Sequence, residues 1–229
     1  MTENLDAIAQ RIREALTVKH QARERAYGLS RQVIRDASNT IRAVHRGETA
    51  AAQAMLASTQ ASVQQIETAI AEHPDLRYTG YVDDAQKEYA EAHFTVCLVA
   101  GTPFPTPEGL GVSYSAYLNG MAEAASEMRR HLLDALRRNE VARCEGMLSS
   151  MDDVYNVLVT MDFPDALTGG LRRTTDQLRA VLERTRGDLT LAIVQDRLAT
   201  RLAGIDAKLG GVPDAAVRPL KDFRPEGDL

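Results

Sequence analysis

The chain has 229 residues and a formal net charge of −5; 44% of its residues are hydrophobic, 26% are charged and only 5% are aromatic. This length can bury a substantial core, and the shortage of aromatic residues favours helices over a β-sandwich. The negative net charge excludes a uniformly basic nucleic-acid binder but leaves room for local basic patches.

The first predicted element is one long amphipathic helix from Glu3 to about His45. Its apolar residues recur every three or four positions, without a proline, at Leu5, Ile8, Ile12, Ala15, Ala22, Ala26, Leu29, Val33, Ala37, Ile41 and Val44. At about 1.5 Å per residue the helix would be roughly 60 Å long. Because this exceeds the diameter of a small domain, we expect it to pack along a long bundle or against partners.

Five further helices are predicted, separated by breaks rich in glycine and proline. Gly47 should end the first helix and Thr49 should cap the second. The predicted ranges are 49–72, 81–101, 115–138, 140–161 and 170–209. No strand pattern or internal repeat occurs, so the sequence predicts an all-α fold: an antiparallel bundle of six to seven long helices. We expect one domain, residues 1–209, followed by a poorly ordered C-terminal tail, residues 210–229.

Cysteine content and hydropathy indicate a cytoplasmic protein. Cys97 and Cys144 lie far apart, each within a predicted helix, which is neither a disulfide framework nor a metal-binding pattern. The N-terminus is charged and amphipathic, unlike a signal peptide, and the longest apolar run is too short to cross a membrane. We therefore expect no membrane partner.

Pairs of glutamates occur at helical spacing on two consecutive predicted helices. Glu88 and Glu91 share one helix face, and Glu123 and Glu127 share a face of the next helix. If the helices pack together, the four carboxylates could converge, which is costly unless a cation neutralises them. Carboxylate oxygens suit Mg²⁺ or Mn²⁺. On spacing alone, however, a solvated face is the more ordinary explanation.

Three metal chemistries were compared with this spacing. A ferritin-like di-iron site needs Glu-x-x-His motifs, which the chain lacks. All-α nucleotide pyrophosphatases use Glu-x-x-Glu followed by Glu-x-x-Asp; Glu88 and Glu91 fit the first motif, but Glu123 and Glu127 have the wrong spacing for the second. A divalent-metal nuclease is the third class. Spacing leaves the last two open.

Arginines of the first and last helices, together with Arg130, are candidates for binding phosphates. Some of the arginines will pair with carboxylates at helical spacing, while others could line a nucleic-acid surface. The residues predicted to contact nucleic acid are Arg31, Arg35, Arg130, Arg172 and Arg173.

Three stretches resemble the translin family, especially its prokaryotic single-subunit members. Residues 161–190, MDFPDALTGGLRRTTDQLRAVLERTRGDLT, look like the family's C-terminal signature. Residues 115–136 are similar to its Tyr-Leu-x-Gly stretch, and EYAEAHF resembles the motif of translin-associated factor X, the catalytic partner of translin. The resemblance spans nearly the whole chain in the right order, apart from the C-terminal tail.

The resemblance implies an all-α bundle assembled into a hollow homo-octamer that encloses single-stranded RNA and, for translin itself, also single-stranded DNA. It places the acidic residues of factor X, which support a divalent-metal ribonuclease, on Glu88, Glu91, Glu123 and Glu127. Where the family has Asp, this chain has Glu123, whose side chain is one methylene longer. Because the acidic set is present, the chain resembles the catalytic factor X type more than the binding-only type.

The leading hypothesis is therefore a Mg²⁺- or Mn²⁺-dependent endoribonuclease acting on single-stranded RNA inside a homo-oligomeric cage. The alternative is a non-catalytic oligomer that binds single-stranded RNA or DNA, with the carboxylates in a structural role. A nucleoside triphosphate pyrophosphatase on an all-α scaffold is the third hypothesis. No organic cofactor is expected.

Overall fold

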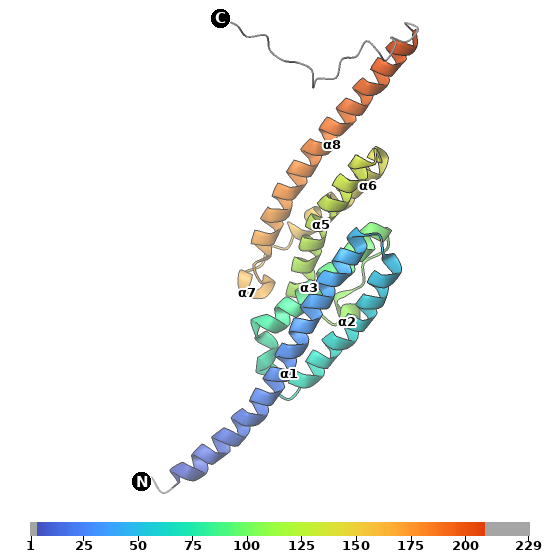
Figure 1. Ribbon diagram of the computed structural model, residues 1–229. Helices are drawn as coiled ribbons and strands as arrows, with labels where there is room; N and C mark the ends of the chain where they lie inside the picture. The colour runs from blue at the N-terminus through green and yellow to red at the C-terminus, as the bar shows by residue number, and fades with distance from the viewer. Residues whose placement is uncertain (1–3, 209–229) are drawn as a thin grey trace, which may run out of the picture.

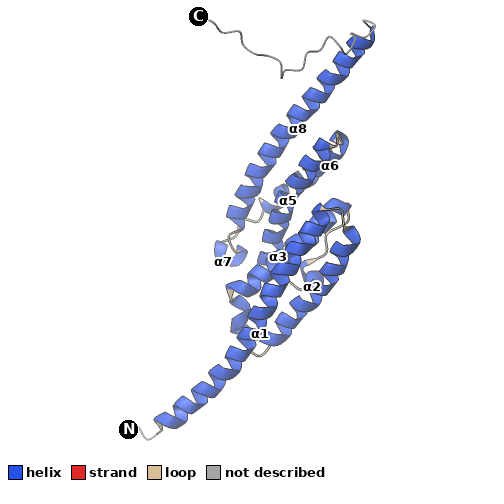
Figure 2. Ribbon diagram, in the orientation of Figure 1, coloured by secondary structure: helices blue, strands red, loops and turns tan. Residues whose placement is uncertain are grey.

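The computed structural model describes residues 4–208, and all regular secondary structure in this range is helical (Figure 2). The six long helices are α1 (Leu5–His45), α2 (Thr49–Ile70), α3 (Gly80–Ala100), α5 (Tyr114–Arg137), α6 (Val141–Leu158) and α8 (Leu171–Lys208). The all-α prediction is confirmed. The predicted domain, residues 1–209, contains all of these helices, and that it folds as one unit remains a prediction. The predicted tail, residues 210–229, lies outside the described residues.

The long helices pack side by side, with α1 between α2 and α3 (Figure 1). Helices α1 and α2 form a hairpin, α3 packs on α1, and α5 packs on α3. Helix α6 folds back along α5, and α8 lies against both α5 and α6. Helix α3 and helix α5 are therefore the central pair, so side chains at their contact are buried or half-buried by the rest of the bundle.

The predicted helix ends match the observed ones to within three residues, but the predicted N-cap of α2 is wrong. Thr49 was predicted to cap α2, but it is the first helical residue, and the cap position belongs to Glu48 without a side-chain hydrogen bond. The Glu48 carboxylate instead accepts two hydrogen bonds of 2.7 Å from Arg46. Gly47, whose φ is +76°, makes the turn between the two helices.

Short helices occur inside the two segments predicted as loops. Helix α4 (Pro107–Leu110) begins at Thr106, whose hydroxyl accepts a hydrogen bond from the Gly109 backbone nitrogen. Helix α7 (Asp165–Thr168) lies in the second loop, and a 3-10 turn, η1 (Pro74–Tyr78), joins α2 to α3. Their proline- and glycine-rich sequences are typical of breaks, and one helical turn is too short to show a periodic pattern.

The two longest helices extend past the bundle at opposite ends (Figure 1). In α1 the first buried residue is Ala26, and in α8 the last is Leu189. The projecting ends carry exposed apolar side chains, namely Leu5, Ile12, Leu16 and Val18 on α1 and Leu191, Val194, Leu198, Leu202 and Ile205 on α8. Across residues 4–208, no helix combines the length and the apolar character that a membrane crossing requires.

Candidate metal centre

The candidate site lies where α3 and α5 make direct backbone contact. Gly120 of α5 permits this approach, since an added Cβ would lie 2.7 Å from the Lys87 carbonyl oxygen and 2.9 Å from the Glu91 backbone nitrogen. Backbone atoms cannot give way unless the helices separate. Gly120 therefore fixes α5 against the turn of α3 that carries the acidic motif.

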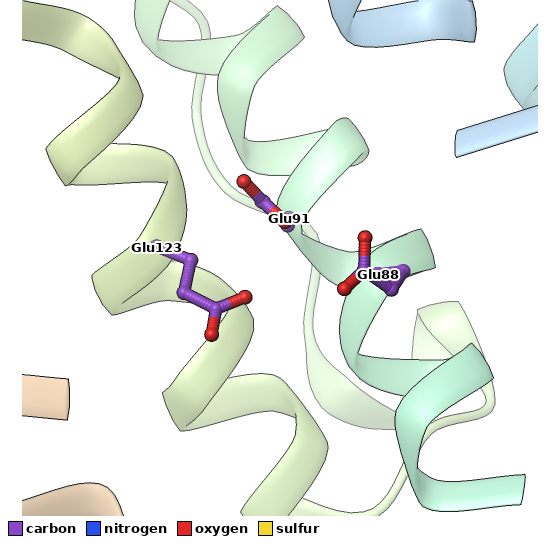
Figure 3. Close-up of side chains that lie close together, drawn as sticks. All are labelled: Glu88, Glu91 and Glu123. Carbon is purple, nitrogen blue, oxygen red and sulfur yellow. The ribbon is translucent and has the colours of Figure 1, made fainter. Parts of the chain in front are cut away.

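Three carboxylates from the two helices face one another at this contact (Figure 3). Glu88 and Glu91 project from α3 on one face, as their three-residue spacing predicts, and Glu123 projects from α5 one turn after Gly120. One oxygen of each carboxylate lies within 4.8 Å of an oxygen of the other two. The structure thus brings together three of the four glutamates singled out from the sequence.

Glu91 is the most deeply placed of the three, with 9% of its surface exposed. Burial, followed by the negative charges of Glu123 and Glu88, raises its pKa to about 8, and the Lys87 ammonium acts in the opposite direction. Near neutral pH the Glu91 carboxyl therefore keeps its proton unless additional positive charge arrives. A cation bound nearby would lower the pKa of Glu91 and favour its ionised form.

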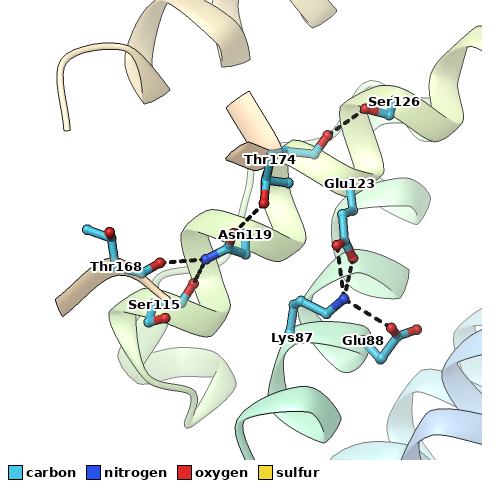
Figure 4. Close-up of polar contacts among 9 residues, drawn as sticks. Lys87, Glu88, Ser115, Asn119, Glu123, Ser126, Thr168 and Thr174 are labelled. Carbon is cyan, nitrogen blue, oxygen red and sulfur yellow. Dashed lines mark hydrogen bonds and ion pairs between the residues drawn. The ribbon is translucent and has the colours of Figure 1, made fainter. Parts of the chain in front are cut away.

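A lysine that the sequence analysis did not single out lies between the carboxylates (Figure 4). The Lys87 ammonium donates to both Glu123 oxygens, at 2.9 and 2.7 Å, and lies 3.2 Å from Glu88 Oε1. Burial lowers the pKa of Lys87, but the bonds to Glu123 and the charge of Glu88 outweigh burial and raise it overall. Lys87 is therefore a charged cation inside the acidic cluster.

Glu127, the fourth predicted glutamate, lies outside the three-carboxylate cluster and has its own partner. Its Oε2 is 2.9 Å from Nε2 of His45, the last residue of α1. The His45 side chain is 5% exposed, so the imidazole holds the Glu127 carboxylate from a buried position. The negative charge of Glu127 still raises the pKa of Glu91, which places it near the cluster without joining it.

A cleft of about 440 Å³ opens beside the cluster, between α3, α5 and the beginning of α8. Lys87 and Glu123 form part of its wall, and Arg173 of α8 contributes a second positive charge. Asp84, on the same stripe of α3 as the glutamates, also lines the cleft. A ligand in this cleft would lie next to Glu123, one of the three carboxylates, and would contact two cationic side chains.

Asn119 fixes the α8 side of this cleft (Figure 4). Its amide nitrogen donates to the carbonyl oxygens of Thr168, at 2.7 Å, and Ser115, at 3.0 Å, and its amide oxygen accepts from the Thr174 hydroxyl at 2.7 Å. The side chain is 4% exposed, so these bonds are shielded from water. Asn119 thereby links α5 to the α7–α8 connection next to Arg173.

Comparison with known proteins gives consistent relatives, although no protein-family model matches the chain. A protein of Methanocaldococcus jannaschii, MJ0175, is 26% identical over 196 residues, covering 85% of this chain and 86% of that protein. The structure of an AfC3PO–duplex RNA complex matches with a TM-score of 0.76 and 29% identity, and that of AfC3PO alone with 0.75 and 29%. Each covers 82% of this chain and 97% of the AfC3PO chain.

The chain has the translin-like fold of the C3PO proteins. NeC3PO, at 17% identity and a TM-score of 0.71, shares the same fold over 84% of this chain. The resemblance to the translin family inferred from the three sequence stretches is confirmed. The matched AfC3PO chains are covered almost to their full length, so the likeness extends over the bundle as a whole.

On this translin-like fold the predicted arginines occupy different surfaces. Arg173 lines the cleft beside Glu123, and Arg172 joins it in a neighbouring pocket on α8. Arg130 lies with Glu127 and Arg129 in a pocket of about 540 Å³ on α5. Arg31 and Arg35 are exposed on α1. Of the five, only Arg173 shares a pocket with the three-carboxylate cluster among the pockets described above.

The three-carboxylate cluster of this chain could bind a metal ion. Its donors are all carboxylate oxygens, which prefer hard divalent cations. Burial and the neighbouring carboxylates raise the pKa of the Glu91 carboxyl, and a cation would supply the positive charge that its ionised form lacks. The side chains of Glu88 and Glu123 are 26% and 32% exposed, which leaves a path from the cleft.

Two residues of the site, Lys87 and His45, were not predicted because each contacts a glutamate on a different helix. Lys87 directly precedes Glu88, and adjacent residues on one helix point about 100° apart. Lys87 therefore meets the cluster only because α5 presents Glu123 on its side of α3. His45 lies at the end of another helix, and its 82-residue separation from Glu127 leaves no local signal. Lys87 directly precedes the EYAEAHF motif, so its charge next to Glu88 was the available clue.

Proposed function

We propose that this chain is a divalent-metal-dependent endoribonuclease that binds single-stranded RNA as a homo-oligomer. The observation that carries the proposal is the convergence of Glu88, Glu91 and Glu123 beside a cleft that also contains Arg173. Likeness to an AfC3PO–duplex RNA complex, at 29% identity, supports RNA as the ligand class. A cytoplasmic location belongs to the same proposal, supported by the buried free thiols of Cys97 and Cys144.

In this proposal Glu88, Glu91 and Glu123 hold Mg²⁺ or Mn²⁺, and Glu127 contributes negative charge from its position beside His45. When bound, such an ion supplies Lewis acidity and an activated water for attack on a phosphodiester. The chain's own groups orient the RNA. Arg173 lies across the cleft from the carboxylates and would bind a phosphate of the RNA backbone close to the site of cleavage.

The remaining predicted arginines extend this surface. Arg172 is exposed next to Arg173, Arg130 lies beside Glu127, and Arg31 and Arg35 are exposed on α1. Contacts of this kind bind phosphates without reading the bases, so affinity should fall steeply as salt rises. Oligomer formation, with an octamer as the expected size, is supported by the exposed apolar ends of α1 and α8.

One observation favours a second function, an RNA- or single-stranded DNA-binding oligomer without catalysis. Lys87 already compensates Glu123 and Glu88, so the carboxylates could serve as a structural ion-pair network. In that case the cleft would bind nucleic acid and the cluster would do no chemistry. The two functions differ in one measurable respect, namely metal-dependent cleavage.

The test is cleavage of a labelled single-stranded RNA, and of the duplex formed with its complement, by the purified oligomer in Mn²⁺ and in EDTA. We expect cleavage only with Mn²⁺, and at least about a hundredfold loss for the double variant Glu88→Gln/Glu91→Gln, since it removes two of the three proposed ligands. RNA affinity and oligomer size should not change. The double variant Glu145→Gln/Glu183→Gln, at two exposed positions, makes the same charge change away from the site.

Cleavage that persists in EDTA, or that the Glu88→Gln/Glu91→Gln variant retains, would disprove the metal-dependent mechanism. RNA binding without any cleavage in Mn²⁺ would favour the non-catalytic oligomer instead. Because AfC3PO was solved with duplex RNA, the duplex substrate also tests the preference for single strands.

A further inference from the structure

The Lys87 ammonium lies among carboxylate oxygens that a bound cation would also use. It contacts both oxygens of Glu123 and one oxygen of Glu88, which are two of the three groups proposed as metal ligands. Its side chain is 25% exposed, compared with 37% for Lys19, which pairs with the exposed Asp75. Lys87 is therefore held inside the site, whereas Lys19 forms an ordinary surface ion pair.

The packing of α3 against α5 places the Lys87 backbone where its side chain can reach Glu123. Gly120 allows α5 to pack directly against the Lys87 carbonyl oxygen, so the lysine backbone lies close to α5. Glu123 follows Gly120 by three residues and therefore lies on the same face of α5, within reach of the ammonium. The packing that assembles the carboxylates thus also places a positive charge among them.

Without a counter-charge, the ionised carboxylates of Glu88 and Glu123 would repel each other at this separation. Lys87 offsets part of that repulsion and keeps Glu123 directed at α3. A divalent cation would do the same, but it would need the oxygens that the ammonium already occupies. Ammonium and metal cannot both make close contacts with the same carboxylate oxygens without repelling each other.

We propose that Lys87 is a built-in competitor for the metal site: it compensates Glu123 and Glu88 before metal arrives, and it must be displaced when metal binds. Lys87 thereby sets the metal concentration at which the site fills. The inference rests on the metal site of the proposed function. Lys87 is a positioning residue in this proposal, because it affects metal binding only through the Glu123 and Glu88 carboxylates that it contacts.

The test is Mn²⁺ binding to the full-length oligomer without RNA, measured by isothermal titration calorimetry for the wild type and for Lys87→Met. Methionine keeps most of the side-chain volume and removes the charge. We expect the apparent Kd for Mn²⁺ to fall by about tenfold, the size typical of removing a charge-assisted contact from two carboxylates. Damage to the fold would weaken binding, so a tighter Kd separates competition from a merely structural role.

Two variants make the comparison matched. Lys87→Arg keeps the positive charge and should leave the Kd within about threefold of the wild type, because the guanidinium can also pair with Glu123. Lys19→Met makes the same substitution at the remote Asp75 pair and should not change Mn²⁺ affinity. If Lys87→Met does not assemble, Lys87→Gln replaces it in the same titration.

An unchanged or weaker Kd in Lys87→Met, with clear Mn²⁺ binding by the wild type, would overturn the role of Lys87 and leave the metal site in place. An equal gain in Lys19→Met would show a general charge effect and would also overturn it. If neither the wild type nor Lys87→Met binds Mn²⁺ at millimolar concentration, the metal site and the competitor role both fail.

Discussion

The contact between α3 and α5 and the projecting ends of α1 and α8 represent opposite ways of using a helix surface. At the contact a glycine brings two backbones together, and polar side chains such as Lys87 and Asn119 find partners within the same chain. At the projecting ends, apolar side chains such as Leu198 remain more than half exposed, although their spacing is that of a packing face. One surface is complete within the single chain and the other is not.

This difference separates the two roles proposed for the chain, metal-dependent chemistry and assembly. Chemistry requires fixed geometry, and the α3–α5 contact favours it because the missing side chain of Gly120 lets the two backbones pack directly against each other. Assembly requires apolar surface that stays free until a partner covers it. Substitutions at the contact should therefore change folding and metal binding, whereas substitutions at the ends should change assembly.

The largest effect is expected for Gly120→Ala. Its Cβ would lie 2.7 Å from the Lys87 carbonyl oxygen and 2.9 Å from Ala90 Cβ, so α5 has to shift away from α3. We expect the free energy of unfolding to fall by about 2–4 kcal/mol, as measured by urea denaturation at fixed protein concentration. Mn²⁺ binding should weaken in the same variant, because Glu123 moves away with α5.

Gly28→Ala is the matched control for this prediction. Gly28 lies within α1, and an added Cβ would have no heavy atom within 4 Å. Alanine there should raise the free energy of unfolding by about 0.5–1 kcal/mol through helix propensity alone. Equal effects of the two substitutions would show that the close approach at Gly120 has no special role.

The next effect concerns Glu91 and pH in the absence of metal. Below about pH 4.5, the ordinary pKa, the carboxyl is protonated in both the folded and the unfolded chain; between pH 4.5 and about 8 only the folded chain keeps the proton. The folded state then binds more protons, so the contribution of this group to stability falls as pH rises through that window. Glu91→Gln, which cannot ionise, should be more stable than the wild type by about 2–3 kcal/mol at pH 8 and nearly equal to it at pH 4.5.

The measurement is urea denaturation of both proteins in EDTA at several pH values. Glu145→Gln, at an exposed position on α6, controls for the loss of one carboxylate and should show no such pH-dependent difference. A wild type and Glu91→Gln variant with parallel stability curves would mean that Glu91 ionises normally in the folded protein.

Sequence patterns predicted the three carboxylates of this site from helical spacing, and missed the partners that Lys87 and His45 find on other helices. The spacing of Glu88 and Glu91 was enough to place them on one face, and the loop between helices suggested that Glu123 would join them. Spacing also suggested Glu127, but a residue four positions further along α5 meets the end of α1, where His45 binds it. The role of Lys87 depends on the α3–α5 approach, which no local pattern encodes.

The helices themselves were predictable because their apolar periodicity is long and their ends carry strong signals. Gly101 adopts a left-handed conformation at the end of α3, and the Ser113 hydroxyl caps α5. The one-turn helices α4 and α7 gave no periodic signal, and their proline and glycine content indicated loops. Short elements of this kind form because their ends are held by the bundle, as Asn119 holds the Thr168 carbonyl at the end of α7.

The smallest effect on folding is expected at the projecting end of α8. Leu198 and Leu202 are 56% and 52% exposed, so replacing both with serine removes little surface that is buried within the chain. We expect the helix content to stay unchanged and the unfolding free energy of the single chain to change by less than about 0.5 kcal/mol. The oligomer should nevertheless shift to smaller species in light scattering coupled to gel filtration, because the two leucines would lose their burial against another copy.

Val157→Ser is the control, since Val157 is 48% exposed on α6, away from the projecting ends. It should leave the oligomer intact. If the double variant of α8 keeps the wild-type mass at the same protein concentration, then this apolar face is not an assembly surface, and the exposed apolar residues of α1 would have to account for the oligomer. A loss of assembly together with retained Mn²⁺ binding would show that the metal site is complete within one chain, as the α3–α5 contact indicates.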